Sequence, residues 1–254
     1  MSMDKKTVLA FCAHPDDVEF MCAGTLALLH KKGWQIHIAT MTPGDCGSME
    51  LSPAQISKVR KKEAAASAKL LGGKYYCAES RDIFVIYDKA TILKAVKILR
   101  QTQPAIVFAP SPEDYMLDHE VASTIVRSAC FAAGIPNIKT PGVKPFGHVP
   151  CLYYVDPIEA KDKFGVFVKP ELSVDISSVM TTKEKMLCCH ASQREWLRAH
   201  HGMDEYVLAM KRHGELRGKE INVKYAEGFR QHLGHAYPHD NILKQELGNL
   251  VHFS

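Results

Sequence analysis

Long hydrophobic runs are missing from this sequence. No stretch approaches the roughly 18 to 20 consecutive apolar residues of a membrane-spanning helix, so we expect no membrane span. The apolar residues after Lys5 and Lys6 end at the acidic segment 14–19, which predicts a core strand rather than a signal peptide. The eight cysteines contain no C-x-x-C pair, and reduced, buried thiols are their simpler interpretation, which favours a cytoplasmic protein.

An excess of one charge is also missing. The formal net charge is only +4, and the densest basic run, residues 58–62, lies within a predicted helix, where a solvated helix face is the simpler interpretation. We therefore expect neither a nucleic acid nor an anionic membrane surface as a partner. Hydrophobic residues make up 46% and charged residues 24%, as in ordinary globular proteins, and no linker or repeat divides residues 1–254, so we expect a single domain.

The first half of the chain alternates regularly between predicted strands and helices. Apolar runs rich in β-formers predict strands at residues 7–13, 35–42, 74–78 and 105–110. Helical spacing and end signals predict helices at residues 23–32, 53–71, 89–102 and 118–133. Four such alternations with short connections favour an α/β fold, a mostly parallel sheet with helices on both faces. The second half predicts strands at 149–155 and 172–176 and helices at 182–199 and 203–216.

Two acidic loops with histidines follow the first and fourth predicted strands. His14, Asp16 and Asp17 come directly after the first strand, and Asp118 and His119 end the loop after the fourth. In parallel sheets ligands bind beyond the carboxyl ends of the strands, so we expect the two loops to meet there. Nitrogen and oxygen ligands suit a divalent ion, and a catalytic zinc takes three protein ligands and leaves one position open.

The spacing favours particular ligands. His14 and Asp17 are three residues apart, so both can point inward while Asp16 faces the open coordination position, and His119 supplies the third ligand. Asp118 could then fix a ring or a loop. Taken alone, each residue has a structural explanation: either aspartate could cap the next helix, and His119 could lie on the surface. Together, at this edge of a sheet, they favour a metal site.

The first loop resembles a known signature. His14–Glu19, read as H-P-D-D-V-E, is similar to the A-H-P-D-D-x-E motif of the PIG-L/LmbE-like family of zinc-dependent N-acetylglucosaminyl deacetylases. Supporting similarities run along nearly the whole chain, at Thr42–Gly47, Arg60–Glu63, Asp118–His119, Lys185–Gln193 and Tyr225–Phe229. The resemblance implies a Rossmann-like fold, zinc bound by His14, Asp17 and His119, and Asp16 as general base, in agreement with the choice made from spacing.

One position departs from the family pattern. Several members have H-x-D-H, with a first histidine proposed to transfer protons, and the chain has Met116 there. The leaving group would then be protonated by Asp16 acting a second time, by His190, or by a C-terminal histidine such as His232 or His235. An ordinary helix position explains His190 as well.

Candidate substrate contacts are fewer. Arg60 could reach an anionic or hydroxyl group, and Arg81-Asp82 resembles a family position that contacts sugar hydroxyls. Solvated positions explain Arg60 and Arg81 as well.

The sequence therefore predicts zinc-dependent hydrolysis of an N-acyl amide, in the first place N-acetyl, on an amino sugar or sugar conjugate, with Fe²⁺ as an alternative ion. Asp16 would take a proton from a zinc-activated water that attacks the amide carbon. Alternatives are an amidase for another N-acylated small molecule, and a metal- or sugar-binding protein without catalysis, which Met116 suggests and Asp16 argues against. No G-x-G-x-x-G follows the first strand, which opposes a nucleotide-binding protein. The oligomeric state stays open, a homo-oligomer included.

Overall fold

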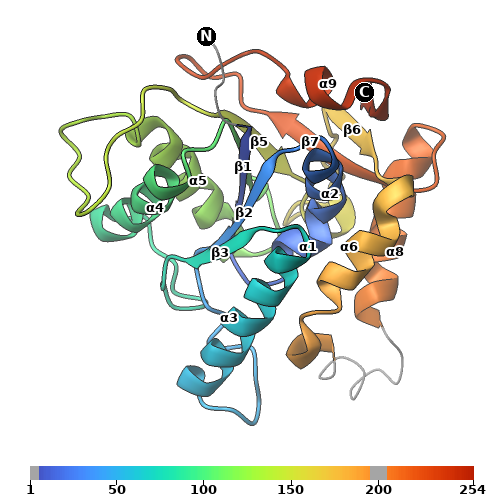
Figure 1. The fold of residues 1–254 in the computed structure, drawn as a ribbon. Helices are drawn as coiled ribbons and strands as arrows, with labels where there is room; N and C mark the ends of the chain where they lie inside the picture. The colour runs from blue at the N-terminus through green and yellow to red at the C-terminus, as the bar shows by residue number, and fades with distance from the viewer. Residues whose placement is uncertain (1–5, 195–204) are drawn as a thin grey trace.

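One large sheet organises the protein (Figure 1). The computed structural model describes residues 6–194 and 205–254. The sheet has eight strands in the order β3-β2-β1-β4-β5-β7-β6-β8. The first five are parallel, whereas β7 pairs antiparallel with β5 and β6, and β6 pairs antiparallel with β8. The strands are β1 (Thr7–Cys12), β2 (Gln35–Thr40), β3 (Lys74–Cys77), β4 (Ile106–Ala109), β5 (Cys151–Val155), β6 (Leu172–Asp175), β7 (Ala226–Gln231) and β8 (Val251–Phe253).

Helices cover both faces of this sheet, which confirms the predicted α/β architecture. Figure 1 shows α4 and α5 on one side and α1, α2, α3, α6 and α8 on the other. Each side encloses its own hydrophobic core, one with Leu26 and Ile36 and the other with Leu9 and Ile125. The helices are α1 (Asp17–Met21), α2 (Ala23–Lys31), α3 (Pro53–Leu70), α4 (Lys89–Thr102), α5 (Leu117–Ala132), α6 (Met180–Leu187), α8 (Glu205–Glu220) and α9 (Ile242–Leu247).

The central strand β1 explains why the sheet has this form. All six of its residues are buried, with Val8 and Ala10 in one core and Leu9 and Phe11 in the other, because side chains alternate between the faces of a strand. β1 pairs with β2 on one side and with β4 on the other. The chain therefore reverses its direction across the sheet between β1 and β4, which places the loops after these strands side by side.

Several elements differ from the sequence-based expectations. A short helix, α1, precedes the helix predicted at 23–32, and Cys22 separates the two. α2 begins there because the Glu227 carboxylate accepts hydrogen bonds from Gly24 N and Thr25 N, at 2.9 and 2.7 Å. The predicted helix at 182–199 is interrupted after Leu187, and α8 continues to Glu220. Residues 195–204, which include the end of the first predicted helix and the start of the second, lie outside the described residues. β7, α9 and β8 were not predicted.

No described helix combines the length and apolarity needed to cross a membrane. All eight cysteines lie within the described residues and none forms a disulfide; four of them are buried. The extent of a single domain over residues 1–254 stays a prediction.

Candidate active site

The loops after β1 and β4 bring three potential metal ligands together. His14 Nδ1 lies 3.2 Å from His119 Nε2. Asp17 completes the triangle, with Oδ2 3.6 Å from His14 Nδ1 and Oδ1 3.6 Å from His119 Nε2. Both imidazoles are buried, and all three residues line one cavity. Residues 105 positions apart in the sequence thus offer their ligand atoms to one point.

These separations fit a divalent ion of the size of zinc. Ligand atoms bound at about 2.0–2.2 Å in a tetrahedron lie about 3.3–3.6 Å apart. The two imidazole nitrogens lie 3.2 Å apart, and each lies 3.6 Å from a different oxygen of the Asp17 carboxylate, which is close to that spacing. Two other groups, His14/Asp82/Asp118 and Asp45/Cys46/Asp82, could also hold a metal. Both of these groups include Asp82, whose carboxylate accepts hydrogen bonds at both oxygens, from the Thr42 hydroxyl and from Cys46 N, whereas Asp17 accepts its two backbone hydrogen bonds at Oδ2 alone. The described residues therefore fit the metal best at His14, Asp17 and His119.

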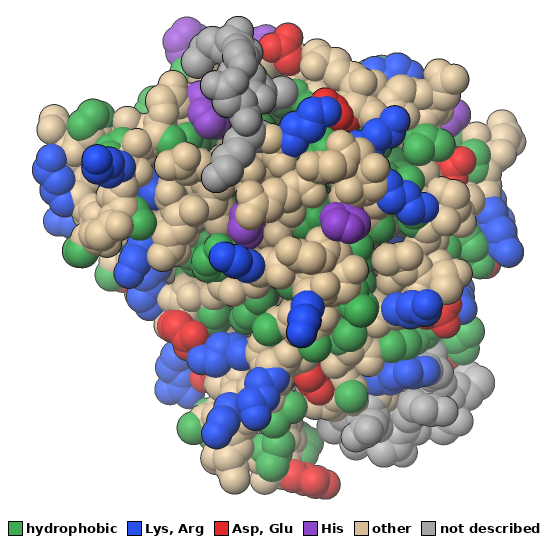
Figure 2. All heavy atoms as spheres, in the orientation of Figure 1, with side chains coloured by type: hydrophobic (Ala, Val, Ile, Leu, Met, Phe, Trp, Pro, Cys, Tyr) green, Lys and Arg blue, Asp and Glu red, His purple; other side chains and the backbone are tan. Residues whose placement is uncertain are grey.

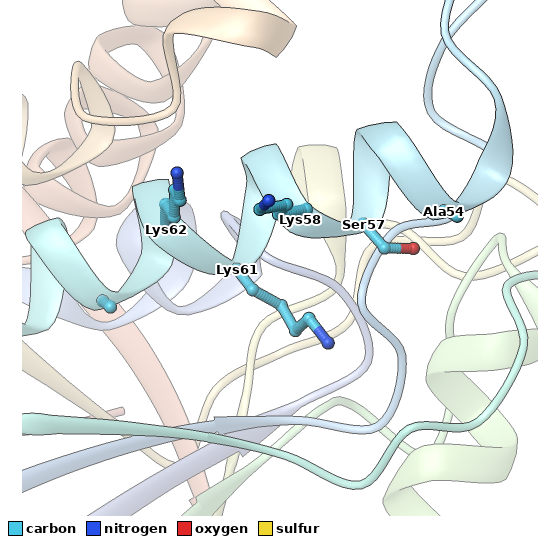
Figure 3. A pocket seen from close by; sticks show the side chains of 6 residues that line it. Ala54, Ser57, Lys58, Lys61 and Lys62 are labelled. Carbon is cyan, nitrogen blue, oxygen red and sulfur yellow. The ribbon is translucent and has the colours of Figure 1, made fainter.

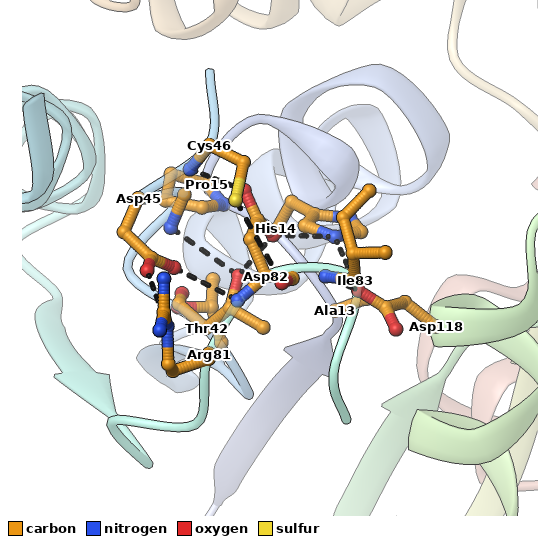
Figure 4. A network of polar contacts seen from close by, with 12 residues as sticks. Ala13, His14, Pro15, Thr42, Asp45, Cys46, Arg81, Asp82, Ile83 and Asp118 are labelled. Atoms are coloured by element: carbon orange, nitrogen blue, oxygen red, sulfur yellow. Dashed lines mark hydrogen bonds and ion pairs between the residues drawn. The ribbon is translucent and has the colours of Figure 1, made fainter. Parts of the chain in front are cut away.

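Carboxylates contact the second nitrogen of each imidazole, the one that does not face the other candidate ligands. His14 Nε2 lies 2.9 Å from Asp82 Oδ1 and 3.3 Å from Asp118 Oδ2 (Figure 4). His119 Nδ1 lies 3.0 Å from Asp114 Oδ1. A hydrogen bond to the far nitrogen fixes ring orientation and raises the basicity of a histidine that binds a metal. Although burial lowers it, the pKa of His14 is raised well above its usual value, because the surrounding carboxylates favour the protonated ring.

Asp16 occupies a strained backbone position beside this cluster. Its φ of 108° lies in the left-handed region that only glycine enters easily. Its Oδ2 accepts a hydrogen bond from the Tyr206 hydroxyl at 2.5 Å and lies 3.3 Å from Arg60 Nη2. Burial raises the pKa of Asp16 above its usual value, and the Arg60 charge opposes that rise. Asp16 thus faces the cavity with its carboxylate held by two donors.

Arg60 is buried, so the solvated helix position considered for it is wrong. Its exposed fraction is 4%, and Nη2 donates to Pro15 O at 2.6 Å. Gly44, with a φ of +73°, lies against the guanidinium, and a Cβ there would overlap with it. The glycine of the Thr42–Gly47 loop is thus required both for the turn and for the passage of Arg60. Arg81, in contrast, is largely exposed and pairs with Asp45 Oδ2 at 3.3 Å.

The other predicted residues divide between the cavity wall and the interior. The cavity has a volume of about 430 Å³, and Asp16, Arg60 and Asp82 all line it. Asp82 Oδ1 accepts from the Thr42 hydroxyl and Oδ2 from Cys46 N, so its carboxylate already has partners besides His14. His190 is completely buried, with Nε2 3.3 Å from Glu19 Oε2, and is not among the lining residues. A catalytic role for His190 stays a prediction, and its burial favours an indirect one.

Two residues of the site, Asp114 and Tyr206, were not predicted from the sequence. Asp114 lies in the acidic run after β4, five residues before His119, and that run was the only signal for it. Tyr206 comes from the first turn of α8, 190 positions from Asp16, and no spacing in the sequence links the two.

The basic run in α3 forms no site comparable to this one. A surface hollow of about 550 Å³ follows the outer face of the helix beside Lys58, Lys61 and Lys62 (Figure 3). Lys61 pairs with Glu79 at 2.9 Å. Lys and Arg side chains are spread over the face of the molecule shown in Figure 2 rather than gathered in a stripe. The solvated helix face predicted for this run agrees with the positions of Lys58, Lys61 and Lys62, and Arg60 is the exception.

Comparison with known proteins places the chain in a family. A family model described as PIG-L, GlcNAc-PI de-N-acetylase, matches residues 9–130. The 4-oxalmesaconate hydratase of Pseudomonas putida is 26% identical over 244 residues, which cover 91% of this chain and 90% of the relative. The diacetylchitobiose deacetylase of Thermococcus kodakarensis is 30% identical over 198 residues, 75% and 71% of the two chains. The structure of N,N'-diacetylchitobiose deacetylase from Pyrococcus horikoshii has a TM-score of 0.77 and 28% identity, over 94% of this chain and 89% of that one. The chain therefore belongs to the PIG-L family.

Proposed function

We propose that this protein is a zinc-dependent hydrolase that removes an acyl group, in the first place acetyl, from the nitrogen of an amino sugar or sugar conjugate. The observation that carries the proposal is the convergence of His14, Asp17 and His119, whose ring nitrogens and carboxylate oxygens lie 3.2–3.6 Å apart, beside the half-buried Asp16 carboxylate, which is not needed as a ligand. His14, Asp17 and His119 would hold the ion, and iron(II) could take the same ligands. Diacetylchitobiose deacetylases among the relatives support the reaction and the substrate class.

The residues of the chain supply the proton transfers. When bound, the divalent ion contributes Lewis acidity, which polarises an amide carbonyl and acidifies water. Asp16 accepts the proton of the water whose oxygen attacks the amide carbon. Asp16 then returns that proton to the nitrogen as the C–N bond breaks, which releases a carboxylic acid and an amine. Met116 cannot transfer a proton, and the place of Asp16 in the cavity wall favours this second use of its carboxyl over a role for buried His190.

Arg60 and Tyr206 prepare Asp16 for this cycle. Their donors converge on Oδ2 of its carboxylate, which favours the charged form that accepts a proton. Burial raises the pKa of the Tyr206 hydroxyl well above its usual value, so at neutral pH the hydroxyl keeps its proton and remains a donor. In this proposal Arg60 acts on Asp16, and a direct contact from Arg60 or Asp82 to a substrate hydroxyl is secondary.

Hydration of a carbon–carbon double bond is a second candidate, because the hydratase relative covers about as much of the chain as any relative named above. The lining disfavours it. A substrate with several carboxylates would meet Asp16, Asp17 and Asp82, and the Arg60 guanidinium is the one Lys or Arg group among the described lining residues. That guanidinium is already bonded to Pro15 O and Asp16. Amide hydrolysis therefore agrees better with the charge of the cavity.

The state of the cysteines bears on the cellular compartment of the protein. All eight cysteines lack disulfides, which supports a reducing compartment, and we propose the cytoplasm. We also propose that residues 1–254 form one domain and that the partner is a small molecule rather than a nucleic acid.

Two aspartate variants test the proposal as a matched pair. The protein is loaded with zinc, its bound metal is measured, and amine release from N-acetylglucosamine conjugates is followed for wild type, Asp16→Asn and Asp17→Asn. We expect Asp16→Asn to keep its zinc and to lose at least about a hundredfold in kcat, and Asp17→Asn to lose the zinc. Equal turnover in wild type and Asp16→Asn would remove Asp16 from the mechanism. Zinc lost from Asp16→Asn but kept by Asp17→Asn would reverse the two roles.

A further inference from the structure

The cavity has two unlike walls. The polar wall contains the three candidate ligands together with Asp16, Arg60 and Asp82. The rest of the lining is largely apolar, and its large or aliphatic side chains are Phe20, Ile83, Tyr115, Met116, Ile158 and Ala209. A metal site for a free sugar needs hydroxyl partners on several sides, because each buried hydroxyl without a partner weakens binding. The apolar wall offers contact area instead.

Much of this apolar surface is exposed to solvent in the free protein. Ile83 is 60% exposed and Tyr115 58% exposed. Nearby in the chain but outside the lining, Phe84 and Leu117 are 63% and 67% exposed. Scattered apolar residues are ordinary on a surface, but exposed apolar side chains that line a cavity, here called the apolar rim (Ile83 and Tyr115), favour a binding surface there. A substrate group that covers the rim would remove this surface from water.

The apolar wall is also held in place beside the candidate metal ligands. The Tyr115 ring packs edge-on against the His119 ring, with centroids 5.7 Å apart and planes at 86°. The backbone of Ile83 donates to Asp118 Oδ2 at 2.7 Å, the same carboxylate oxygen that lies 3.3 Å from His14 Nε2 (Figure 4). Surfaces fixed in this way lose little conformational entropy when a ligand binds.

Met116 belongs to the apolar wall and occupies the position of the first histidine in the H-x-D-H pattern of several family members. Its side chain is half-buried, and its backbone N donates to Asp114 Oδ1 at 3.1 Å, so its position is tied to the carboxylate that orients His119. A thioether is flexible and polarisable and adapts to aromatic and aliphatic groups. The exchange of histidine for methionine thus replaces a proton carrier with a contact surface.

We infer that this wall selects an N-acylated substrate that carries an apolar aryl or alkyl group next to the reacting amide, rather than a free N-acetylated sugar. The inference rests on the proposed function for the reaction itself. It assigns the specificity to Ile83, Tyr115 and Met116. An aryl group that covers part of this wall should tighten binding about tenfold to a hundredfold.

Binding to a non-hydrolysing variant tests the inference without depending on turnover. Zinc-loaded Asp16→Asn is titrated by calorimetry with N-acetylglucosamine and with its 4-nitrophenyl β-glycoside. We expect the aryl glycoside to bind at least about tenfold more tightly. Adding Met116→Gln, which keeps the length of the side chain, or Ile83→Ser should reduce that ratio to below about threefold. Leu70→Ser, on α3 and 50% exposed, removes a comparable apolar side chain outside the cavity and should leave the ratio unchanged.

Equal Kd values for the two ligands, or a ratio that survives both wall substitutions, would overturn the inference. Amine release is measured separately with wild-type enzyme. A preserved aryl preference without any amine release would reject the proposed hydrolysis and leave the apolar specificity standing. Amine release at equal kcat/KM from both compounds, together with equal Kd values, would support the proposed hydrolysis and reject the apolar specificity.

Discussion

Asp16 is the residue on which the proposed chemistry depends; burial raises its pKa, and the Arg60 charge and the Tyr206 hydroxyl both oppose that rise. The Tyr206 hydroxyl donates to Asp16 Oδ2, which favours the carboxylate and lowers the pKa of Asp16 against the effect of burial. Tyr206→Phe removes this donor, so the pKa of Asp16 should rise further. Because Asp16 must be ionised to accept a proton, activity should then be lost at higher pH as the solution is acidified.

The measurement is the pH profile of kcat/KM for the zinc-loaded enzyme. We expect the acid limb of Tyr206→Phe to move to higher pH, with a loss of several-fold at neutral pH. Tyr115→Phe is the control, since Tyr115 lines the same cavity but does not bond to Asp16. An unchanged acid limb in Tyr206→Phe, or an equal shift in the control, would show that the contact with Tyr206 does not set the ionisation of Asp16.

How far single residues could be predicted depended on whether their partners lie nearby in the sequence. His14, Asp16 and Asp17 form one compact loop, and His119 follows another strand, so the rule about strand ends was enough to bring them together. The contact with Tyr206 could not be predicted, because it depends on where α8 crosses the cavity. The burial of Arg60 was hidden by its exposed neighbours, which make that turn of α3 look solvated.

At the scale of elements, a buried ion pair ties α8 to the end of β5. Arg217 Nε donates to Asp156 Oδ2 at 2.7 Å and Nη2 to Val168 O at 2.6 Å, and its exposed fraction is 2%. Removing Arg217 leaves the buried Asp156 carboxylate without its guanidinium partner, and of its ion-pair partners only His213, with Nε2 3.5 Å from Oδ2, remains among the described residues. We expect Arg217→Leu to lower the free energy of unfolding by about 3–5 kcal/mol.

Urea denaturation of the metal-free protein measures this effect. Arg212→Leu is the matched control on the same helix, because Arg212 is exposed and its pair with Glu205 should contribute less than about 1 kcal/mol. Adding Asp156→Asn to Arg217→Leu should recover part of the loss, since it removes the buried charge that has lost its guanidinium partner. Equal destabilisation by Arg217→Leu and Arg212→Leu would mean that the buried pair does not anchor α8.

Strands and helices, like single residues, could be predicted only where the signal for them is local in the sequence. β1 and β4 are buried and largely apolar, and β2 is buried from Ile36 onward, so their sequences predict strands. The predicted ranges agree with the structure within two residues at each end. β7 was missed because it carries Glu227 and Arg230, whose charges argue against a strand. Glu227 is tolerated because Lys183 Nζ lies 2.5 Å from Oε1 while α2 donates to the same carboxylate. That partner set is long-range and leaves no local pattern in the sequence.

At the scale of the whole molecule, the metal should add stability without determining the fold. Two hydrophobic cores hold the sheet, and the ligands come from loops at one edge, so the metal-free protein should fold. Binding to the native state alone contributes about 2.7 kcal/mol when the free ion is at a hundredfold its Kd. For a chain of this size that corresponds to an increase in Tm of about 5–10 °C.

Scanning calorimetry of chelated and zinc-loaded protein tests this expectation. His119→Ala should abolish the increase in Tm, because it removes one of the three ligands from a different loop. Cys46→Ser should preserve the increase, because Cys46 belongs only to the neighbouring Asp45/Cys46/Asp82 group. If Cys46→Ser abolished the increase and His119→Ala kept it, the ion would bind to the Asp45/Cys46/Asp82 group. The proposed hydrolysis would then lose its metal site, since the proposal assigns the ion to ligands from the loops after β1 and β4.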